Sequence, residues 1–106
     1  GNGSADGPMI FTGHKPAYFV VKRTNLTQSW VEKDAARDPY NVATASIYLN
    51  LTNAEGSDND LDILSTGVKL RNAGHTGSNA SGSTYVYISF ATNPFGGANT
   101  TPMTAR

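Results

Sequence analysis

A β-hairpin is predicted by the stretch Leu61-Asp62-Ile63-Leu64-Ser65-Thr66-Gly67-Val68-Lys69-Leu70-Arg71, in which two apolar segments flank Ser65-Thr66-Gly67. The glycine can supply the positive φ that a short hairpin connection needs. A second stretch, Thr84-Tyr85-Val86-Tyr87-Ile88-Ser89-Phe90-Ala91, has β-branched and aromatic residues in strict alternation. Such alternation predicts one long strand with two different faces.

Further strands are expected wherever β-branched and aromatic residues recur between turn signals. These segments are 9–11, 17–23, 29–33 and 46–52. In the last of them we expect Ile47, Leu49 and Leu51 to form the buried face. The sequence therefore predicts an all-β protein, a β-sandwich or jelly-roll-like single domain of about seven short antiparallel strands.

The remaining segments are rich in glycine, asparagine and serine, which favour turns and loops. Residues 1–106 are expected to form one β domain, with 1–8 as a loop-like lead and 95–106 as an extended tail across the surface or against a neighbour. Residues 34–41 are predicted to be a structured loop, 53–59 a polar loop and 74–82 a mobile loop.

Composition argues against several classes of partner. Charged residues make up 15% of the chain and the formal net charge is zero, whereas proteins that bind nucleic acid usually carry a basic face. No apolar stretch approaches the roughly 20 residues that a membrane-spanning helix needs. We therefore expect no nucleic-acid partner and no membrane insertion.

No catalytic or metal-binding motif stands out. Asp58, Asp60 and Asp62 alternate, but Ile63 stands where a calcium loop needs glycine and Lys69 where it needs glutamate, so we interpret the aspartates as a solvated strand edge. The chain has no cysteine, and its histidines, His14 and His75, are far apart in the sequence. We expect no enzymatic activity, no cofactor, no metal and no catalytic residues.

Several segments, in the same order along the chain, resemble the C-terminal domain of tail-fibre-like structural proteins of aquatic bacteriophages. The matching segments are 1–8, 13–17, 21–24, 34–41, 60–71 and 81–95. The resemblance implies a non-enzymatic virion protein that assembles in the host cytoplasm, lies on the tail or capsid surface and forms a homotrimer. Its partners would be copies of itself, other virion proteins and a host surface glycan.

Aromatic residues provide the candidate contact sites, because aromatic rings stack on sugars and also pack well at protein interfaces. The candidate ligand or receptor site combines two aromatic residues with a polar loop: Trp30, Asp34, Arg37, Tyr40 and Asn41. The candidate subunit interface consists of four strand tyrosines and one residue of the tail: Tyr18, Tyr48, Tyr85, Tyr87 and Phe95.

Three functions fit these observations. The first is a tail-fibre or spike domain that contributes to host attachment. The second is a capsid decoration (cement) protein, and the third is a stand-alone carbohydrate-binding module. The sequence leaves open which of them applies and whether the chain is one domain of a longer protein.

Overall fold

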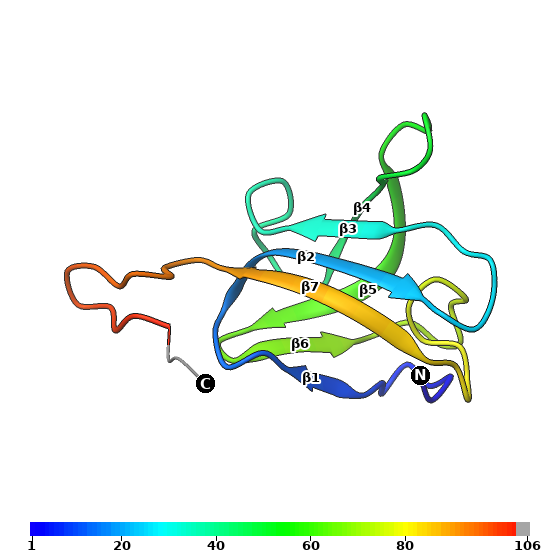
Figure 1. Cartoon of the computed structure of the whole chain (residues 1–106), viewed down its shortest axis with the longest axis horizontal. Helices are drawn as coiled ribbons and strands as arrows, with labels where there is room; N and C mark the ends of the chain where they lie inside the picture. The colour runs from blue at the N-terminus through cyan, green and yellow to red at the C-terminus, as the bar shows by residue number, and fades with distance from the viewer. Residues whose placement is uncertain (104–106) are drawn as a thin grey trace.

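The computed structural model describes residues 1–103, which form seven β-strands (Figure 1). The strands are β1 (Met9–Phe11), β2 (Pro16–Arg23), β3 (Val31–Asp34), β4 (Ala43–Tyr48), β5 (Gly56–Leu64), β6 (Gly67–Leu70) and β7 (Tyr85–Ala91). All neighbouring strands are antiparallel, in the order β1-β6-β5-β4-β3-β2-β7. Within residues 1–103 no helix is long and apolar enough to cross a membrane.

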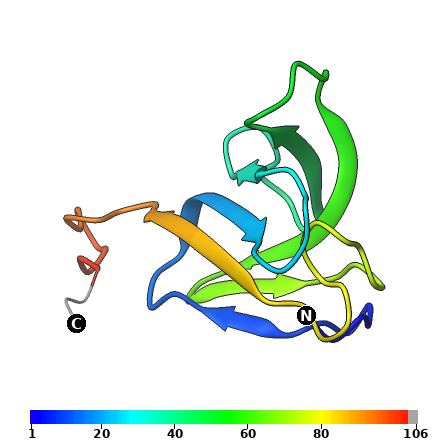
Figure 2. The same cartoon turned by 45° about the vertical axis from the view of Figure 1, so that its right-hand side comes forward.

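The all-β class and the seven antiparallel strands are thus confirmed, but a sandwich or jelly roll is not. The strands belong to one sheet, which curls into a half-barrel with β1 at one edge and β7 at the other (Figure 2). A strongly twisted sheet can cover its own inner face in this way, because curling brings distant strands opposite one another.

The core lies on the inner face of the curl. Alternate residues of each strand point inward, and the buried cluster contains Phe19, Val21, Val31, Ala43, Leu61, Val68 and Leu70. The cluster joins residues of β2 and β3 to residues of β5 and β6, although β4 lies between these two pairs of strands in the sheet. The core therefore depends on the curl and not only on strand pairing.

The predicted strand at 46–52 is shifted in the structure. Strand β4 ends at Tyr48, and the backbone turns there, since the Leu51 N–H donates to the Tyr48 carbonyl oxygen at 3.1 Å. Leu49 and Leu51 are exposed, while Ser46 is fully buried and donates to the Asp58 carbonyl oxygen at 2.6 Å. The prediction that Ile47, Leu49 and Leu51 form the buried face was therefore wrong. Ser46 is buried in place of Ile47, which is half-buried, and the strand ends before Leu49.

The predicted polar loop at 53–59 was also wrong in its second half, since β5 begins at Gly56. Strand β5 lies between β4 and β6, so its aspartates do not form the expected strand edge. Asp58 instead accepts a hydrogen bond from the Tyr48 hydroxyl at 2.5 Å, and Asp62 pairs with Arg71 at 3.4 Å. Because their side chains have partners, these polar residues can form a central strand, which the sequence alone does not indicate.

The loop at 74–82, expected to be mobile, packs against the lead at 1–8. Asn79 is fully buried, and its side-chain amide donates to the carbonyl oxygens of Ser4 and Asn72, each at 2.8 Å. The Gly3 N–H donates to the Asn79 carbonyl oxygen at 3.0 Å. The two loops therefore hold each other in place. Of the predicted tail, residues 104–106 lie outside the described residues, and the segment 95–103 projects beyond the end of β7 (Figure 1).

The close approach of β1 to β6 gives a first testable prediction. A Cβ atom on Gly67 would lie 2.0 Å from the Ile10 carbonyl oxygen, so Gly67→Ala should push β1 away and destabilise the protein by at least about 1–3 kcal/mol. Hydrogen exchange should show faster exchange of the Thr12 amide, which donates to the Thr66 carbonyl oxygen at 3.0 Å. The control is Gly56→Ala, where nothing lies within 4 Å of the added Cβ. Equal exchange in both variants would refute this explanation.

Candidate interaction surface

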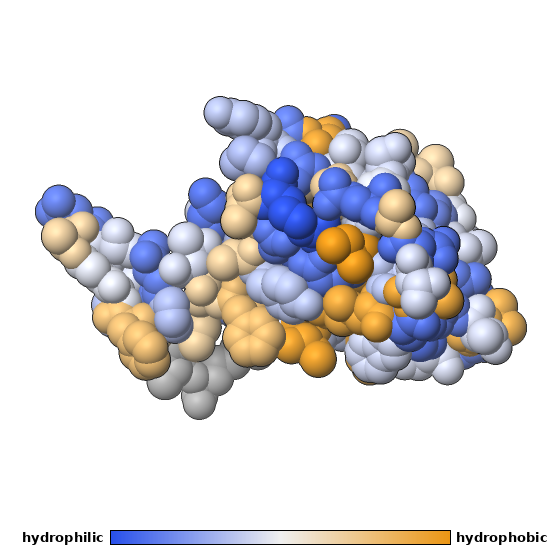
Figure 3. Space-filling view, turned by 90° about the horizontal axis from the view of Figure 1, so that it is seen from above, coloured by the Kyte–Doolittle hydropathy of each residue, from blue (hydrophilic) through white to orange (hydrophobic). Residues whose placement is uncertain are grey.

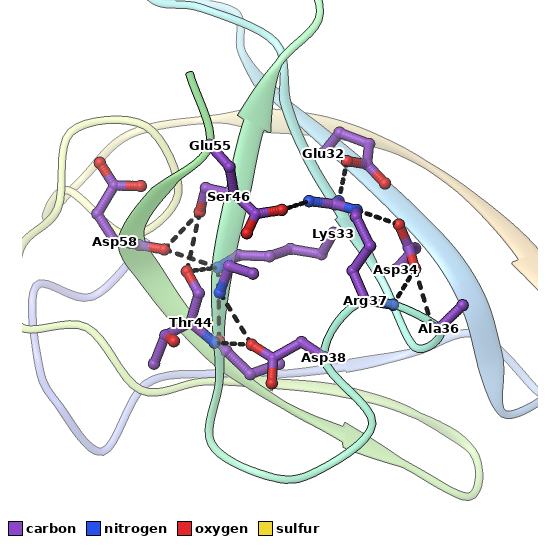
Figure 4. A network of polar contacts seen from close by, with 12 residues as sticks. Glu32, Lys33, Asp34, Ala36, Arg37, Asp38, Thr44, Ser46, Glu55 and Asp58 are labelled. Atoms are coloured by element: carbon purple, nitrogen blue, oxygen red, sulfur yellow. Dashed lines mark hydrogen bonds and ion pairs between the residues drawn. The ribbon is translucent and has the colours of Figure 1, made fainter. Parts of the chain in front are cut away.

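A group of charged side chains on the outer face of the sheet, the Arg37 cluster, consists of Glu32, Asp34, Arg37 and Glu55 (Figure 4). The arginine guanidinium contacts all three carboxylates: Glu32, Asp34 at 2.5 Å and Glu55 at 2.5 Å. Asp34 also accepts the backbone N–H groups of Ala36 and Arg37, which closes the turn after β3. The predicted structured loop is thus held by its own polar groups.

The protonation of the Arg37 cluster follows from burial and pairing. Burial raises the pKa of Glu32, and Arg37 opposes this rise only in part. Burial also acts to raise the pKa of Asp34, but hydrogen bonds from Arg37 and Ala36 lower it overall. Glu32 is only 3% exposed and its Oε1 has no hydrogen-bond partner in the described part of the chain. Pairing with Arg37 therefore stabilises the charged form of Glu32 at this buried position.

Replacing Arg37 with alanine should destabilise the fold by about 1–3 kcal/mol at pH 7, because it leaves a buried carboxylate without its partner. The loss should shrink toward pH 4, because burial raises the pKa of Glu32, and its protonation there removes the buried charge that Arg37 compensates. Urea denaturation at both pH values tests this. As a control, Glu55→Ala removes a carboxylate that is 47% exposed and should cost less than about 1 kcal/mol. A loss in the Arg37 variant that is independent of pH would contradict the explanation.

Lys33 is a buried charged residue that the sequence analysis did not identify. It lies on the inner face of β3 and is 1% exposed. Its ammonium group donates to the carbonyl oxygens of Thr44 in β4 and Asp58 in β5, each at 2.7 Å (Figure 4). Burial lowers the pKa of Lys33 from 10.5 to about 8. The sequence showed only that Lys33 shares a face with Val31, because side chains alternate along a strand.

The structure brings only two members of the predicted ligand site together. Asp34 and Arg37 pair within the Arg37 cluster, while both ends of the Asn41 amide are bonded to the Ile63 backbone, at 2.8 and 2.9 Å. Trp30 immediately precedes β3, and its backbone carbonyl oxygen accepts a hydrogen bond from the Leu49 N–H, just after the end of β4. Tyr40 precedes the start of β4 and is 80% exposed. Trp30 and Tyr40 therefore lie at opposite ends of the β3–β4 pair and do not form a common platform.

The residues of the predicted subunit interface fall into two groups. Tyr48 and Tyr85 are half-buried and use their hydroxyls within the chain, Tyr48 toward Asp58 and Tyr85 toward Ala80 and Thr76. The other three contact aromatic rings or lie uncovered. Tyr18 is half-buried with its ring 6.0 Å from that of Phe90, Tyr87 is 44% exposed and stacks on Phe19 at 5.6 Å, and Phe95 is 94% exposed.

Strand β7 carries three exposed apolar side chains at alternate positions, here called the β7 face: Val86, Ile88 and Phe90, which are 47%, 50% and 60% exposed. These side chains lie beside Lys22, Val20 and Tyr18 of β2, their partners in the register. In Figure 3 apolar side chains gather along the side of the molecule where β7 runs. The alternation of β7 was predicted correctly, and the structure adds that its aliphatic face points outward.

Behind β7, toward β1, the half-barrel leaves a groove of about 330 Å³. Its lining includes Ile10, Val21, Leu70, Tyr85 and Tyr87, so it opens into the apolar interior. Together with the β7 face, the groove makes β7 an edge strand with apolar surface on both sides. Contiguous exposed apolar surface of this kind marks contact sites in soluble proteins.

Comparison with known proteins identifies one family. No curated protein and no solved structure matches the chain. The family described as "Domain of unknown function (DUF7483)" matches residues 1–94, which include all seven strands. The chain therefore belongs to this family.

Proposed function

We propose that this protein is a non-enzymatic structural domain of a bacteriophage virion, within a tail fibre or spike, and that it contributes to host attachment. The proposal starts from the order of the segments that resemble phage tail-fibre domains. The observation that carries it in the structure is the β7 face, since a domain that works through protein contacts needs apolar side chains left uncovered by its own fold.

The β7 face also bears on the predicted β-sandwich or jelly-roll-like arrangement. We propose that another virion protein packs on the outer face of β2 and β7 and supplies the second layer of a sandwich or jelly-roll-like arrangement. Packing two sheets face to face requires apolar residues at alternate positions, which Val86, Ile88 and Phe90 provide. The resemblance further favours a homo-oligomer, with a homotrimer as its form.

A capsid decoration protein is the second candidate, favoured by the segment after β7. This segment leaves the sheet and turns back at its end (Figure 1), and Phe95 is 94% exposed within it. A projecting segment with an uncovered aromatic ring suits a protein that lies across its neighbours. A stand-alone carbohydrate-binding module has less support, because Trp30 and Tyr40 do not share a surface for one sugar.

Copy number in purified phage particles separates these candidates. Quantitative mass spectrometry of peptides from this domain, scaled to the major capsid protein, should find few copies per particle for a fibre or spike domain. A copy number similar to that of the capsid protein would establish the decoration role in place of the fibre role. Absence of the peptides from particles whose other structural proteins are detected would overturn the virion proposal itself.

A further inference from the structure

Strand β7 is a long edge strand without the usual protection against pairing. Natural edge strands are commonly short, or carry charged residues or proline. The other edge, β1, has only 3 residues. In contrast, β7 has 7 residues and its sequence, YVYISFA, contains no charged residue and no proline.

The hydrogen bonds to β2 show which backbone groups of β7 are free. The Thr24 N–H donates to the Thr84 carbonyl oxygen at 3.0 Å, in the same register as the pair Arg23–Tyr85. Residues of an antiparallel pair alternate between hydrogen-bonded and non-hydrogen-bonded positions. The even-numbered residues of β7 therefore bond to β2, and the N–H and C=O groups of Tyr85, Tyr87, Ser89 and Ala91 point away from it.

We propose that β7 pairs in antiparallel with β7 of a second copy of this chain, about a twofold axis at Ile88. In this register Tyr87 faces Ser89 of the second copy, and Tyr85 faces Ala91. These are the four residues whose backbone groups are free, so the pairing satisfies all of them at once. The two curled sheets become one continuous sheet.

The side chains of β7 suit a second copy as the occupant. A twofold axis sets the strand against its own copy, so a strand carrying charges of one sign would repel itself, whereas β7 is uncharged. On the outer face Ile88 meets Ile88, and Val86 meets Phe90 in both directions. Pairs of aliphatic and aromatic residues at such positions stabilise neighbouring strands. The pairing also joins two β7 faces into one larger apolar surface.

This geometry favours a dimer over the homotrimer that the resemblance implies, because a twofold contact cannot close a ring of three. The inference deepens the proposed function and rests on it only in treating β7 as a contact surface. The pairing of β7 and the virion role can be refuted independently of each other. Pairing is measured on the purified protein alone, and the virion role is measured by the copy number in particles.

Light scattering of the purified chain tests the pairing. Small interfaces are weak, so the measurement should run from about 10 µM to about 1 mM, with the mass rising from 11.2 kDa toward twice that value. A mass that stays at 11.2 kDa throughout, or that rises to three times this value and is unaffected by changes at Ile88, would overturn the proposal.

Substitutions at Ile88 locate the axis. Ile88→Lys places two like charges against each other and should weaken association at least about tenfold. The matched control is Leu49→Lys, which adds the same charge at an exposed leucine outside β7 and should leave association unchanged. Ile88→Glu should also be monomeric alone, but an equimolar mixture with Ile88→Lys should restore the doubled mass, because residue 88 meets residue 88. A mixture of folded variants that remains monomeric would place the contact elsewhere.

Discussion

Replacing Phe19 with alanine is expected to lower the free energy of unfolding by about 3–5 kcal/mol, the usual cost of removing a buried phenylalanine. Phe19 is 1% exposed at the centre of the core cluster, where β2 meets the residues of β5 and β6. Its ring also stacks on Tyr87 of β7 at 5.6 Å. The cavity left by the change would lie where the curl of the sheet is held together, so the surrounding strands cannot close it by pairing alone.

Urea denaturation followed by circular dichroism measures this loss. The matched control is Phe95→Ala, which removes the same ring from a position that is 94% exposed and should change stability by less than about 0.5 kcal/mol. Because a domain of this size has only about 5–15 kcal/mol in total, the Phe19→Ala chain can unfold outright. Phe19→Leu, with an expected cost below about 1.5 kcal/mol, then provides a folded comparison. Equal losses for Phe19→Ala and Phe95→Ala would contradict the position of the core.

Stability is expected to rise with pH between pH 8 and pH 10 by about 2 kcal/mol because of Lys33. Burial lowers the pKa of Lys33 from 10.5 to about 8 in the folded chain. Within this interval the unfolded chain binds the proton and the folded chain has released it, so raising the pH favours the folded state. Below pH 8 the ammonium is charged in both states, and its desolvation is a constant cost to the folded protein.

The measurement is urea denaturation at pH values from about 7 to 10. It should stop there, because burial raises the pKa of Tyr18 and Tyr48, and their contribution to stability is lost as the pH rises through 10 and above. Lys33→Met keeps an unbranched apolar side chain of similar length and removes the titrating group. Its stability should be nearly independent of pH in this range. A slope of the same size in Lys33→Met would assign the effect to another group.

Local sequence patterns predicted the strands correctly where apolar and polar residues lie on separate faces of a strand. The hairpin of β5 and β6, the strand Pro16–Arg23 and the alternation of β7 all follow from β-branched residues, aromatic residues and a turn glycine. Prediction failed where polar residues are paired inside the fold. The start of β5 at Gly56 depends on partners for Asp58 and Asn59, and these partners, such as Tyr48, come from a neighbouring strand.

The candidate sites show the same division. The sequence indicated a structured loop that contains Asp34 and Arg37, and these two residues do pair, because they lie within one turn of chain. It joined Trp30 to Tyr40 only because they are near in sequence, and β3 carries them to opposite ends. It did not reveal that Glu32 completes the Arg37 cluster, because the register that places it there is a property of the assembled sheet.

By itself the sequence determined the strand class, the number of strands, the hairpin at Gly67 and the two faces of β7, since each is set by neighbours along the chain. Only the tertiary structure decided that the strands form one curled sheet, that Lys33 lies inside it and that the aliphatic face of β7 lies outside. The physical reason is that alternation defines two faces of a strand but does not say which is covered. That depends on the direction of the curl and on what packs across it.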